Sequence, residues 1–319
     1  RTRFAAAPRK SRGLLFRFSE NSVFNFFDTI LLRFCNRAEL EWEKIKGDTF
    51  MNILVTLDAN YLEPLCHLLR SLQKTHPNRE LHVYVAHASL TAEHFQKIQD
   101  AVGAQNKVFN ICVSEDMLKD APVLKRITKS TYYRLFAAAY LPKDVDRVLY
   151  IDPDTLVLRD LSALYDLDFG DNLYAGCSHV GWFRNFLNTT RLKMTRKTPY
   201  VNAGILMINL SELRKEFSAD EIFRYIEKNA SKLLLADQDV LNALYFDRML
   251  VLDEFLYNCD ESSFKRLCDK FGEEQALDFV RTKTCIIHYN GKFKPWRTTP
   301  VYKGELNRFY PDGLDSKNA

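Results

Sequence analysis

Residues 147–158 read RVLYIDPDTLVL. The run from Val148 to Ile151 is short and apolar, which predicts a strand inside a sheet. Asp152 and Asp154 follow it directly, and residues two apart in an extended chain project to the same side. Two carboxylates this close repel each other unless a cation or a proton lies between them. An isolated Asp-x-Asp is common in surface turns. The apolar residues on both sides of this one favour a metal site at the end of a sheet strand.

Strands and helices alternate along the chain around this segment. Residues 130–140 have a helical pattern that ends at Leu141-Pro142, and Ser218 with Glu221 forms a capping box at the start of a later helix. Further helical patterns cover 61–74 and the residues after Thr91. Strands are predicted at 51–57, 81–86, 108–113, 147–151, 173–177, 204–209, 249–252 and 285–288. This alternation predicts an α/β fold with a mostly parallel central sheet, flanked by helices and binding its ligands at the carboxyl ends of the strands.

The whole chain has the composition of a globular protein. Its 319 residues are 46% hydrophobic and 27% charged, enough for one large core or one core with a modest appendage. The net charge is +4, but residues 1–50 hold ten Lys and Arg against six Asp and Glu, whereas 51–319 hold 35 of each. A neutral main body argues against a nucleic-acid-binding protein with a broad basic face.

The seven cysteines are scattered and contain no C-x-x-C pair. That pattern is typical neither of a zinc site nor of a disulfide framework, and an odd number fits a reducing cytosol. We therefore expect buried or idle thiols and a cytoplasmic protein. The cysteines are Cys35, Cys66, Cys112, Cys177, Cys259, Cys268 and Cys285.

The first fifty residues differ from the rest. The stretch 16–34 is aromatic and apolar, but Arg17, Glu20 and Asp28 interrupt it, and a membrane-spanning helix needs about 20 mostly apolar residues. Two interpretations remain: a basic amphipathic segment on a membrane surface at the inner face, or upstream sequence without a function. We favour the second because no regular helical period runs through the stretch. The expected domains are an extension at 1–50 and a main domain at 51–319.

His288 ends the predicted strand at 285–288, and Gly291 and Lys294 follow it. A histidine beside a strand is more often a packed residue than a ligand. Here the glycine permits close approach of the backbone, and the lysine can reach phosphate oxygens. If the histidine joins the two carboxylates, the mixed ligand set suits Mn²⁺ better than Mg²⁺, which remains the alternative.

Asp58, Asn60 and Tyr61 follow the first predicted strand, where a nucleotide would lie in such a sheet. The two polar side chains can hydrogen-bond a base or a ribose, and the tyrosine ring can stack. An Asx turn that begins the next helix is an equally good interpretation. Neither G-x-G-x-x-G nor G-x-x-x-x-G-K-[ST] occurs, so the other common nucleotide motifs are absent. Two more polar clusters border apolar elements, Asn202-Ala203-Gly204 and Asp237-Gln238-Asp239.

In combination these residues resemble glycosyltransferase family 8, the bacterial lipopolysaccharide galactosyl- and glucosyltransferases and their glycogenin relatives. The resemblance runs from about residue 51 to 310. Six blocks carry it in order: LDANY (57–61), STYYRL (130–135), YIDPDTLV (150–157), NAGILMINL (202–210), ADQDVLN (236–242) and HYNGKFKPW (288–296). The resemblance implies a GT-A fold, UDP-sugar donors, Mn²⁺ and retention of the anomeric configuration.

The resemblance also implies a role for each matching residue. The metal ligands would be Asp152, Asp154 and His288. Uridine would be held by Asp58, Asn60 and Tyr61, and the diphosphate by Gly291 and Lys294. The donor sugar would be surrounded by Arg134, Asn202, Asp237 and Gln238. The sequence departs from the galactosyltransferase pattern at Arg126 and His179, where that group has a histidine and an aspartate on the acceptor or sugar side.

The implied activity is transfer of glucose or galactose from UDP-glucose or UDP-galactose to a glycan or a lipopolysaccharide-type glycolipid. The family offers no obvious carboxylate nucleophile, so we expect front-face attack by the acceptor hydroxyl, with the Gln238 amide stabilising the sugar cation. A sugar nucleotidyltransferase would need a Gly-rich basic loop after the first strand, which LDANY is not. The other alternative is a non-catalytic glycan- or nucleotide-sugar-binding protein on the same fold, although all three metal-ligand candidates are present.

Overall fold

The computed structural model describes residues 50–113, 129–179, 181–194, 199–297 and 301–310. All of them belong to one compact unit, Asp48–Ala319. Arg126 and the stretch 16–34 lie outside the described residues. Within the described part of the chain, the helices are too short or too polar to cross a membrane.

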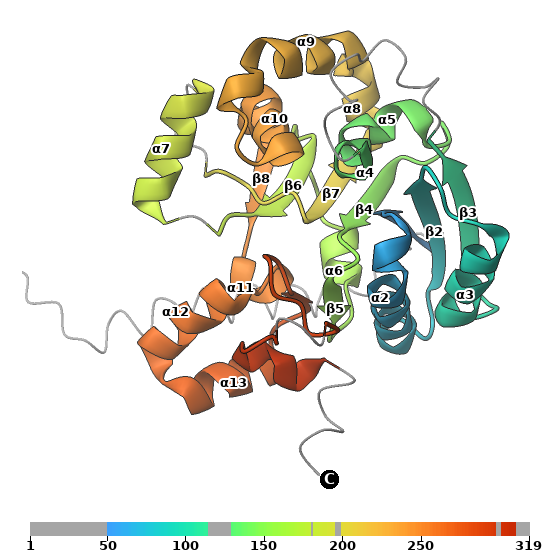
Figure 1. Ribbon diagram of the computed structural model, residues 1–319, viewed down its shortest axis with the longest axis vertical. Helices are drawn as coiled ribbons and strands as arrows, with labels where there is room; N and C mark the ends of the chain where they lie inside the picture. The colour runs from blue at the N-terminus through green and yellow to red at the C-terminus, as the bar shows by residue number, and fades with distance from the viewer. Residues whose placement is uncertain (1–49, 114–128, 180, 195–198, 298–300, 311–319) are drawn as a thin grey trace, which may run out of the picture. The chain divides into compact units, whose positions relative to one another are not determined.

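A central sheet organises this unit (Figure 1). Its strands follow the order β3-β2-β1-β4-β7-β6-β8. Neighbours are parallel except at β7, which runs antiparallel to both β4 and β6. The predicted α/β fold with a mostly parallel sheet is confirmed. The strands are β1 (Phe50–Thr56), β2 (Glu80–His87), β3 (Lys107–Cys112), β4 (Arg147–Ile151), β6 (Tyr174–Cys177), β7 (Ile205–Asn209) and β8 (Met249–Leu252).

Helices cover both faces of the sheet (Figure 1). The cluster on one face contains side chains of α2, α3 and α6, and the cluster on the other contains those of α4, α5, α8, α9 and α10. A third cluster joins α12 and α13 to the C-terminal part of the unit. The helices are α2 (Leu62–Thr75), α3 (Ala92–Val102), α4 (Lys129–Tyr132), α5 (Ala137–Tyr140), α6 (Ser162–Tyr165), α7 (Trp182–Leu192), α8 (Leu210–Glu216), α9 (Ala219–Asn229), α10 (Ala236–Tyr245), α11 (Glu254–Tyr257), α12 (Glu261–Phe271) and α13 (Glu273–Thr282).

The packing of strand β4 explains why its sequence is continuously apolar. Val148, Leu149, Tyr150 and Ile151 are all fully buried. Val148 and Tyr150 enter the cluster on one face, and Leu149 and Ile151 enter the cluster on the other. A strand covered on both faces needs apolar residues at successive positions. Each such side chain contributes about 1.5–3 kcal/mol of burial free energy, so the strand end that carries Asp152 is firmly anchored.

The predicted helix starts are found, and one predicted helix is divided. Thr91 begins α3 with a capping box that His94 completes, and the Ser218 hydroxyl accepts from the N–H of Glu221 at the start of α9. The single helix expected at 130–140 is instead α4, a 3-10 turn η4 (Tyr133–Phe136) and α5. Both helix types bring residues three apart together, so an apolar period does not distinguish them. The tighter turn carries Arg134 into the buried interior.

The last predicted strand forms, but outside the central sheet. Strand β9 (Ile286–His288) pairs antiparallel with the short strand β5 (Thr155–Val157), and His288 lies opposite Thr155. The backbone N–H of Tyr289 donates to the carbonyl of Asp154 at 2.9 Å. This small ladder joins the chain after β4 to the chain after β9.

Candidate active site

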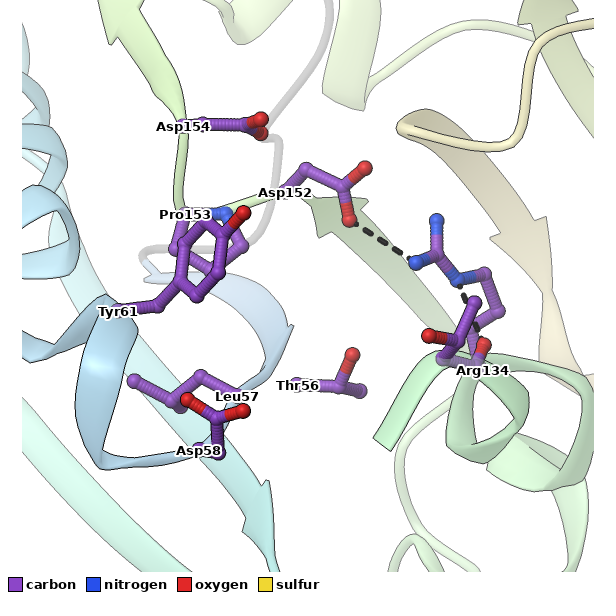
Figure 2. Close-up of a pocket in the computed structure, with 9 residues that line it drawn as sticks. Thr56, Leu57, Asp58, Tyr61, Arg134, Asp152, Pro153 and Asp154 are labelled. Carbon is purple, nitrogen blue, oxygen red and sulfur yellow. Dashed lines mark hydrogen bonds and ion pairs between the residues drawn. The ribbon is translucent and has the colours of Figure 1, made fainter. Parts of the chain in front are cut away.

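Polar segments meet at one edge of the central sheet because of its strand directions. Strands β1 and β4 are parallel, so the residues after their carboxyl ends lie at the same edge, and antiparallel β7 begins there. A cavity of about 300 Å³ opens at this edge (Figure 2). It is lined by Thr56, Leu57, Asp58, Tyr61, Thr131, Arg134, Asp152, Pro153 and Asp154.

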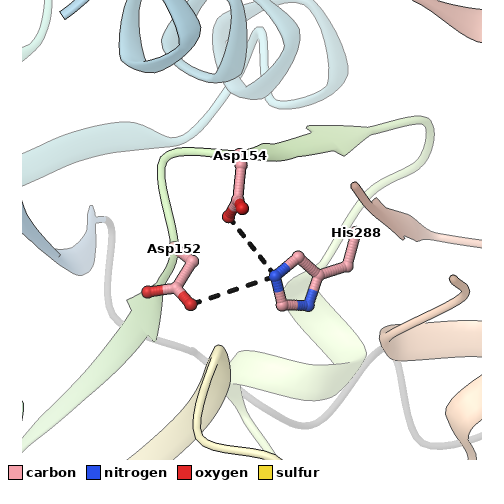
Figure 3. Close-up of side chains that lie close together, drawn as sticks. All are labelled: Asp152, Asp154 and His288. Carbon is pink, nitrogen blue, oxygen red and sulfur yellow. Dashed lines mark ion pairs between the residues drawn. The ribbon is translucent and has the colours of Figure 1, made fainter. Parts of the chain in front are cut away.

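Asp152, Asp154 and His288 converge beside this cavity (Figure 3). Both carboxylates point toward the same ring nitrogen of the histidine. His288 Nε2 lies 3.3 Å from Asp154 Oδ1 and 3.9 Å from Asp152 Oδ2. One ligand atom from each residue lies within 4.8 Å of the others. Oxygen and imidazole ligands at this spacing fit a divalent cation such as Mn²⁺.

The second oxygen of each of the two carboxylates is bound by other side chains of the site. Asp152 Oδ1 pairs with Arg134 Nη2 at 3.1 Å and accepts from the Tyr150 hydroxyl. Asp154 Oδ2 accepts from Lys294 Nζ at 2.5 Å. These contacts turn the remaining oxygen of each carboxylate toward His288. Outer contacts of this kind orient the ligands of metal sites.

Charges inside the site keep Asp154 ionised. Burial by itself would raise its pKa, but His288 and Lys294 more than offset burial and hold the pKa of Asp154 well below its usual range. For His288, burial would lower the pKa, and Asp154 together with Asp152 raises it above the usual value. The site therefore presents a carboxylate, rather than a carboxylic acid, next to the imidazole.

Asn258 is a site residue that the sequence analysis missed. It is fully buried and accepts from His288 Nδ1 at 2.8 Å. Its amide nitrogen donates to Asn202 Oδ1 at 3.0 Å, and Asn202 Nδ2 donates to Gln238 Oε1 at 3.1 Å. These amides form a hydrogen-bonded chain from the histidine ring to Gln238. Asn258 lies in a polar turn, YNCDES, and no local pattern distinguishes it from a solvated loop residue.

Gln238 and Asn202 are fixed by backbone groups as well. The N–H of Ala203 donates to Gln238 Oε1 at 3.1 Å, which determines how the glutamine amide is oriented. The N–H of Gly204 donates to Asn202 Oδ1 at 2.9 Å. The two polar clusters of the sequence are thus brought together at the start of β7 and of α10.

Arg134 lies between two carboxylates. Its Nε is 3.0 Å from Asp237 Oδ2, and its guanidinium lies over the Tyr150 ring, 4.3 Å from the centroid. The Nε–H donates to the Thr131 carbonyl, so the contact with Asp237 is an ion pair without hydrogen-bond geometry. Burial raises the pKa of Asp237 to about 6, although Arg134 acts in the opposite direction.

The residues predicted to hold uridine and diphosphate are only partly brought together. Asp58 and Tyr61 line the cavity, whereas Asn60 is not among its lining residues. The Asp58 carboxylate accepts from the N–H of Asn60 at 2.8 Å, so the Asx turn is present. Lys294 reaches Asp154, but Gly291 borders a different cavity.

His179 follows β6 at the same sheet edge. Its Nδ1 lies 3.3 Å from Asp260 Oδ2, which also accepts from Asn290 Nδ2 at 2.9 Å. Burial would raise the pKa of Asp260, but its contacts with His179, Ser263 and Asn290 hold it well below the usual range. His179, one of the two positions predicted to depart from the galactosyltransferase pattern, therefore contacts a carboxylate of the C-terminal part.

Comparison with protein families gives one match over most of the chain. Residues 52–299 match the model of Glycosyl transferase family 8. The matched region contains every described residue of the cavity and of the Asp152, Asp154 and His288 cluster.

Individual relatives are distant in sequence, but their alignments cover most of this chain. The chain is 26% identical over 264 residues to General stress protein A of Bacillus subtilis (strain 168), covering 80% of this chain and 90% of that protein. It is 25% identical over 278 residues to a Lipopolysaccharide 1,2-glucosyltransferase of Escherichia coli, covering 85% and 81%. Among solved structures, galactosyltransferase LgtC in complex with donor and acceptor sugar analogs matches with a TM-score of 0.68 and 24% identity, over 84% of this chain and 97% of LgtC. The likeness to LgtC establishes a shared fold.

Proposed function

Because this chain belongs to glycosyltransferase family 8, we propose that it moves a hexose from a UDP-sugar onto a glycan or glycolipid acceptor with retention of the anomeric configuration. The observation that carries the proposal is the convergence of Asp152, Asp154 and His288 beside the cavity. We assign these three residues as the ligands of Mn²⁺, with Mg²⁺ as the alternative.

The donor sugar is glucose or galactose in this proposal. A relative from Escherichia coli is named a glucosyltransferase, and the LgtC structure is that of a galactosyltransferase. We assign Asp58, Asn60 and Tyr61 to uridine. Asp58 and Tyr61 border the cavity, and Tyr61 packs its ring edge against Trp296 with centroids 6.2 Å apart.

Departure of UDP leaves negative charge on the diphosphate. A bound divalent cation supplies Lewis-acid stabilisation of that charge. Lys294 is buried at the metal-ligand cluster with its ammonium on Asp154, so we assign it to the same diphosphate. Gly291 is assigned to the diphosphate from the family resemblance alone, because in the structure it borders a different cavity. Arg134 keeps its guanidinium between Asp152 and Asp237 and thereby orients one metal ligand.

We propose front-face attack by the acceptor hydroxyl on the anomeric carbon. Gln238 is the residue assigned to the sugar cation, with Asn202 and Asp237 on the donor-sugar side. The Gln238 carbonyl oxygen already accepts from Asn202 and from the N–H of Ala203. An amide oxygen held this way is a weak nucleophile but an oriented dipole, which supports electrostatic stabilisation over a covalent intermediate.

The test is release of UDP from UDP-glucose and from UDP-galactose, measured with and without Mn²⁺. We expect release that depends on the metal, and we expect Asp154→Ala to abolish it without unfolding the protein. Asp269→Ala is the matched control, because Asp269 is exposed on α12 and pairs with Lys265. Near-normal release by Asp154→Ala would overturn the metal assignment. UDP binding without release from either donor would favour a non-catalytic nucleotide-sugar-binding protein.

A cytoplasmic location stays a prediction, and contact of residues 1–50 with the inner face of a membrane stays the alternative to a segment without a function.

A further inference from the structure

A second cavity borders the residues that precede Lys294. Its volume is about 650 Å³. It is lined by Glu261, Asn290, Gly291, Lys292, Phe293, Val301, Tyr302, Lys303 and Gly304. The loop at 290–294 is therefore connected to both cavities: Lys294 Nζ donates to Asp154, which lines the first cavity, and Asn290 to Phe293 border the second.

The wall of the second cavity is built against a carboxylate. Glu261 Oε1 accepts from the Tyr302 hydroxyl at 2.6 Å and from the N–H of Leu306 at 2.9 Å. A Cβ on Gly304 would collide with the Glu261 carboxyl group, so any larger residue there would displace this side chain. These contacts fix the C-terminal wall to α12.

Two large apolar side chains are exposed at this cavity. Phe293 is 50% exposed and Val301 is 62% exposed. They come from two separate lining segments, 290–293 and 301–304. Single exposed apolar residues are ordinary on a protein surface. Two that line one concave site favour the binding of an apolar group of a ligand there.

The charged residues that line this cavity carry a net positive charge. Lys292 and Lys303 are exposed, and within the described residues neither forms an ion pair. The carboxylate of Glu261 is the acidic group that borders the cavity, and its Oε1 accepts two hydrogen bonds from the protein itself. An apolar site with two unpaired ammonium groups is complementary to an amphiphile that bears a phosphate.

We propose that the second cavity binds the lipid end of the acceptor, a hydrocarbon chain next to a phosphate. The hydrocarbon packs against Phe293 and Val301, and Lys292 and Lys303 bind the phosphate oxygens. The glycan of the same molecule then extends past the loop at 290–294 toward the first cavity. This assignment rests on the proposed function in that the occupant is the acceptor, and it narrows the acceptor class to phosphate-bearing glycolipids.

The experiment is calorimetric binding of dodecyl phosphate to the full chain, below the concentration at which it forms micelles. Inorganic phosphate has the charge without the hydrocarbon, and dodecyl maltoside has the hydrocarbon without the charge. We expect dodecyl phosphate to bind at least about tenfold more tightly than either. The Lys292→Glu/Lys303→Glu double variant and Val301→Asp should each weaken binding about tenfold or more.

The matched control is Lys228→Glu/Lys232→Glu, which makes the same change of net charge on α9 and η5 (Ala230–Lys232). It should leave dodecyl phosphate binding unchanged. UDP binding with Mn²⁺ is measured in every variant and should also be unchanged. Absence of UDP binding by the unsubstituted chain would refute the proposed function while leaving the second cavity as a lipid phosphate site.

Two results would overturn the inference. One is dodecyl phosphate binding that the double variant does not weaken; if that variant also loses binding to vesicles of phosphatidylcholine and phosphatidylglycerol, the two lysines contact a membrane surface rather than a single lipid. The other is dodecyl phosphate binding that is no tighter than binding of inorganic phosphate or dodecyl maltoside.

Discussion

Asn258 carries no charge and has no exposed surface, yet it connects the metal-ligand candidates to the residues that we propose surround the donor sugar. Its oxygen accepts from His288 Nδ1, so Nε2 is the ring nitrogen left to face Asp152 and Asp154. Its nitrogen donates to Asn202. A histidine ligand whose second nitrogen is held in this way keeps one tautomer and one ring orientation.

Two replacements of Asn258 distinguish the effect of its contact with His288 from the effect of its contact with Asn202. In Asn258→Ala both are lost, and we expect Mn²⁺ affinity in the presence of UDP to fall about 10- to 100-fold. In Asn258→Asp the acceptor for His288 is kept, but a carboxylate faces Asn202 Oδ1. Metal affinity should then be retained while kcat falls, because Asn202 no longer supports Gln238. Calorimetry and steady-state kinetics measure the two effects.

Asn106→Ala is the control for this prediction. Asn106 is also buried, and it donates to the carbonyl of Val102 and accepts from the N–H of Leu81, away from the site. Loss of a buried partner should lower the free energy of unfolding by about 1–3 kcal/mol in both alanine variants. If Asn106→Ala weakens metal binding as much as Asn258→Ala does, the effect of Asn258 is general instability.

Gln238 decides between the two mechanisms. If its amide stabilises a developing cation, Gln238→Ala should lower kcat on the order of 10- to 1000-fold, the effect of losing one oriented dipole. KM for the donor should change little, because the interaction strengthens mainly in the transition state. A hexose adduct on Gln238, detected by intact-mass spectrometry of the unsubstituted enzyme, would establish a covalent intermediate and refute front-face attack.

At the level of elements, the turn into β7 is built around the smallest side chain. A Cβ on Gly204 would lie 2.3 Å from His288 Cε1 and 2.8 Å from Asp152 Oδ2. The carbonyl of Gly204 also accepts from the N–H of Asp152 at 2.7 Å. The turn therefore packs directly against two of the three metal-ligand candidates, and its backbone holds the end of β4.

Gly204→Ala should displace His288 or Asp152. Overpacking of this kind costs about 1–3 kcal/mol, so Mn²⁺ affinity should fall roughly tenfold or more. Gly181→Ala is the control, because a Cβ there meets no atom within 4 Å. Metal titration of both variants, with circular dichroism to verify folding, measures the difference. Unchanged affinity in Gly204→Ala would mean that the two side chains can move apart without loss of the site.

At the level of the whole molecule, the compact unit begins at Asp48, and β1 begins at Phe50. The Phe50 ring stacks on His82 with centroids 4.3 Å apart. A shortened chain should therefore keep residue 50 rather than start at Met51. We expect a chain that begins at Asp48 to bind UDP with Mn²⁺ and to release UDP from the donor as the full chain does. A folded but inactive product would show that residues 1–47 take part in the reaction.

The sequence by itself determined the α/β sheet, the family and the position of the Asp pair. Burial on both faces requires the unbroken apolar run at 148–151, and a polar pair directly after such a run has to emerge at the sheet edge. The cap at Thr91 is similarly local, since the side chain and the N–H that it binds are three residues apart. Patterns of this kind depend only on residues that are close in the sequence, so they can be recognised before the three-dimensional structure is known.

Only the tertiary structure decided how the site is assembled. The pairing of β5 with β9 brings His288 beside Asp154, and no local pattern specifies which distant strand a short apolar run will join. The same holds for Asn258, whose importance lies in its two buried partners, and for Gly291, which borders the second cavity rather than the first. Hydrogen bonds and close contacts between distant residues follow from strand register and packing, and these are properties of the folded chain as a whole.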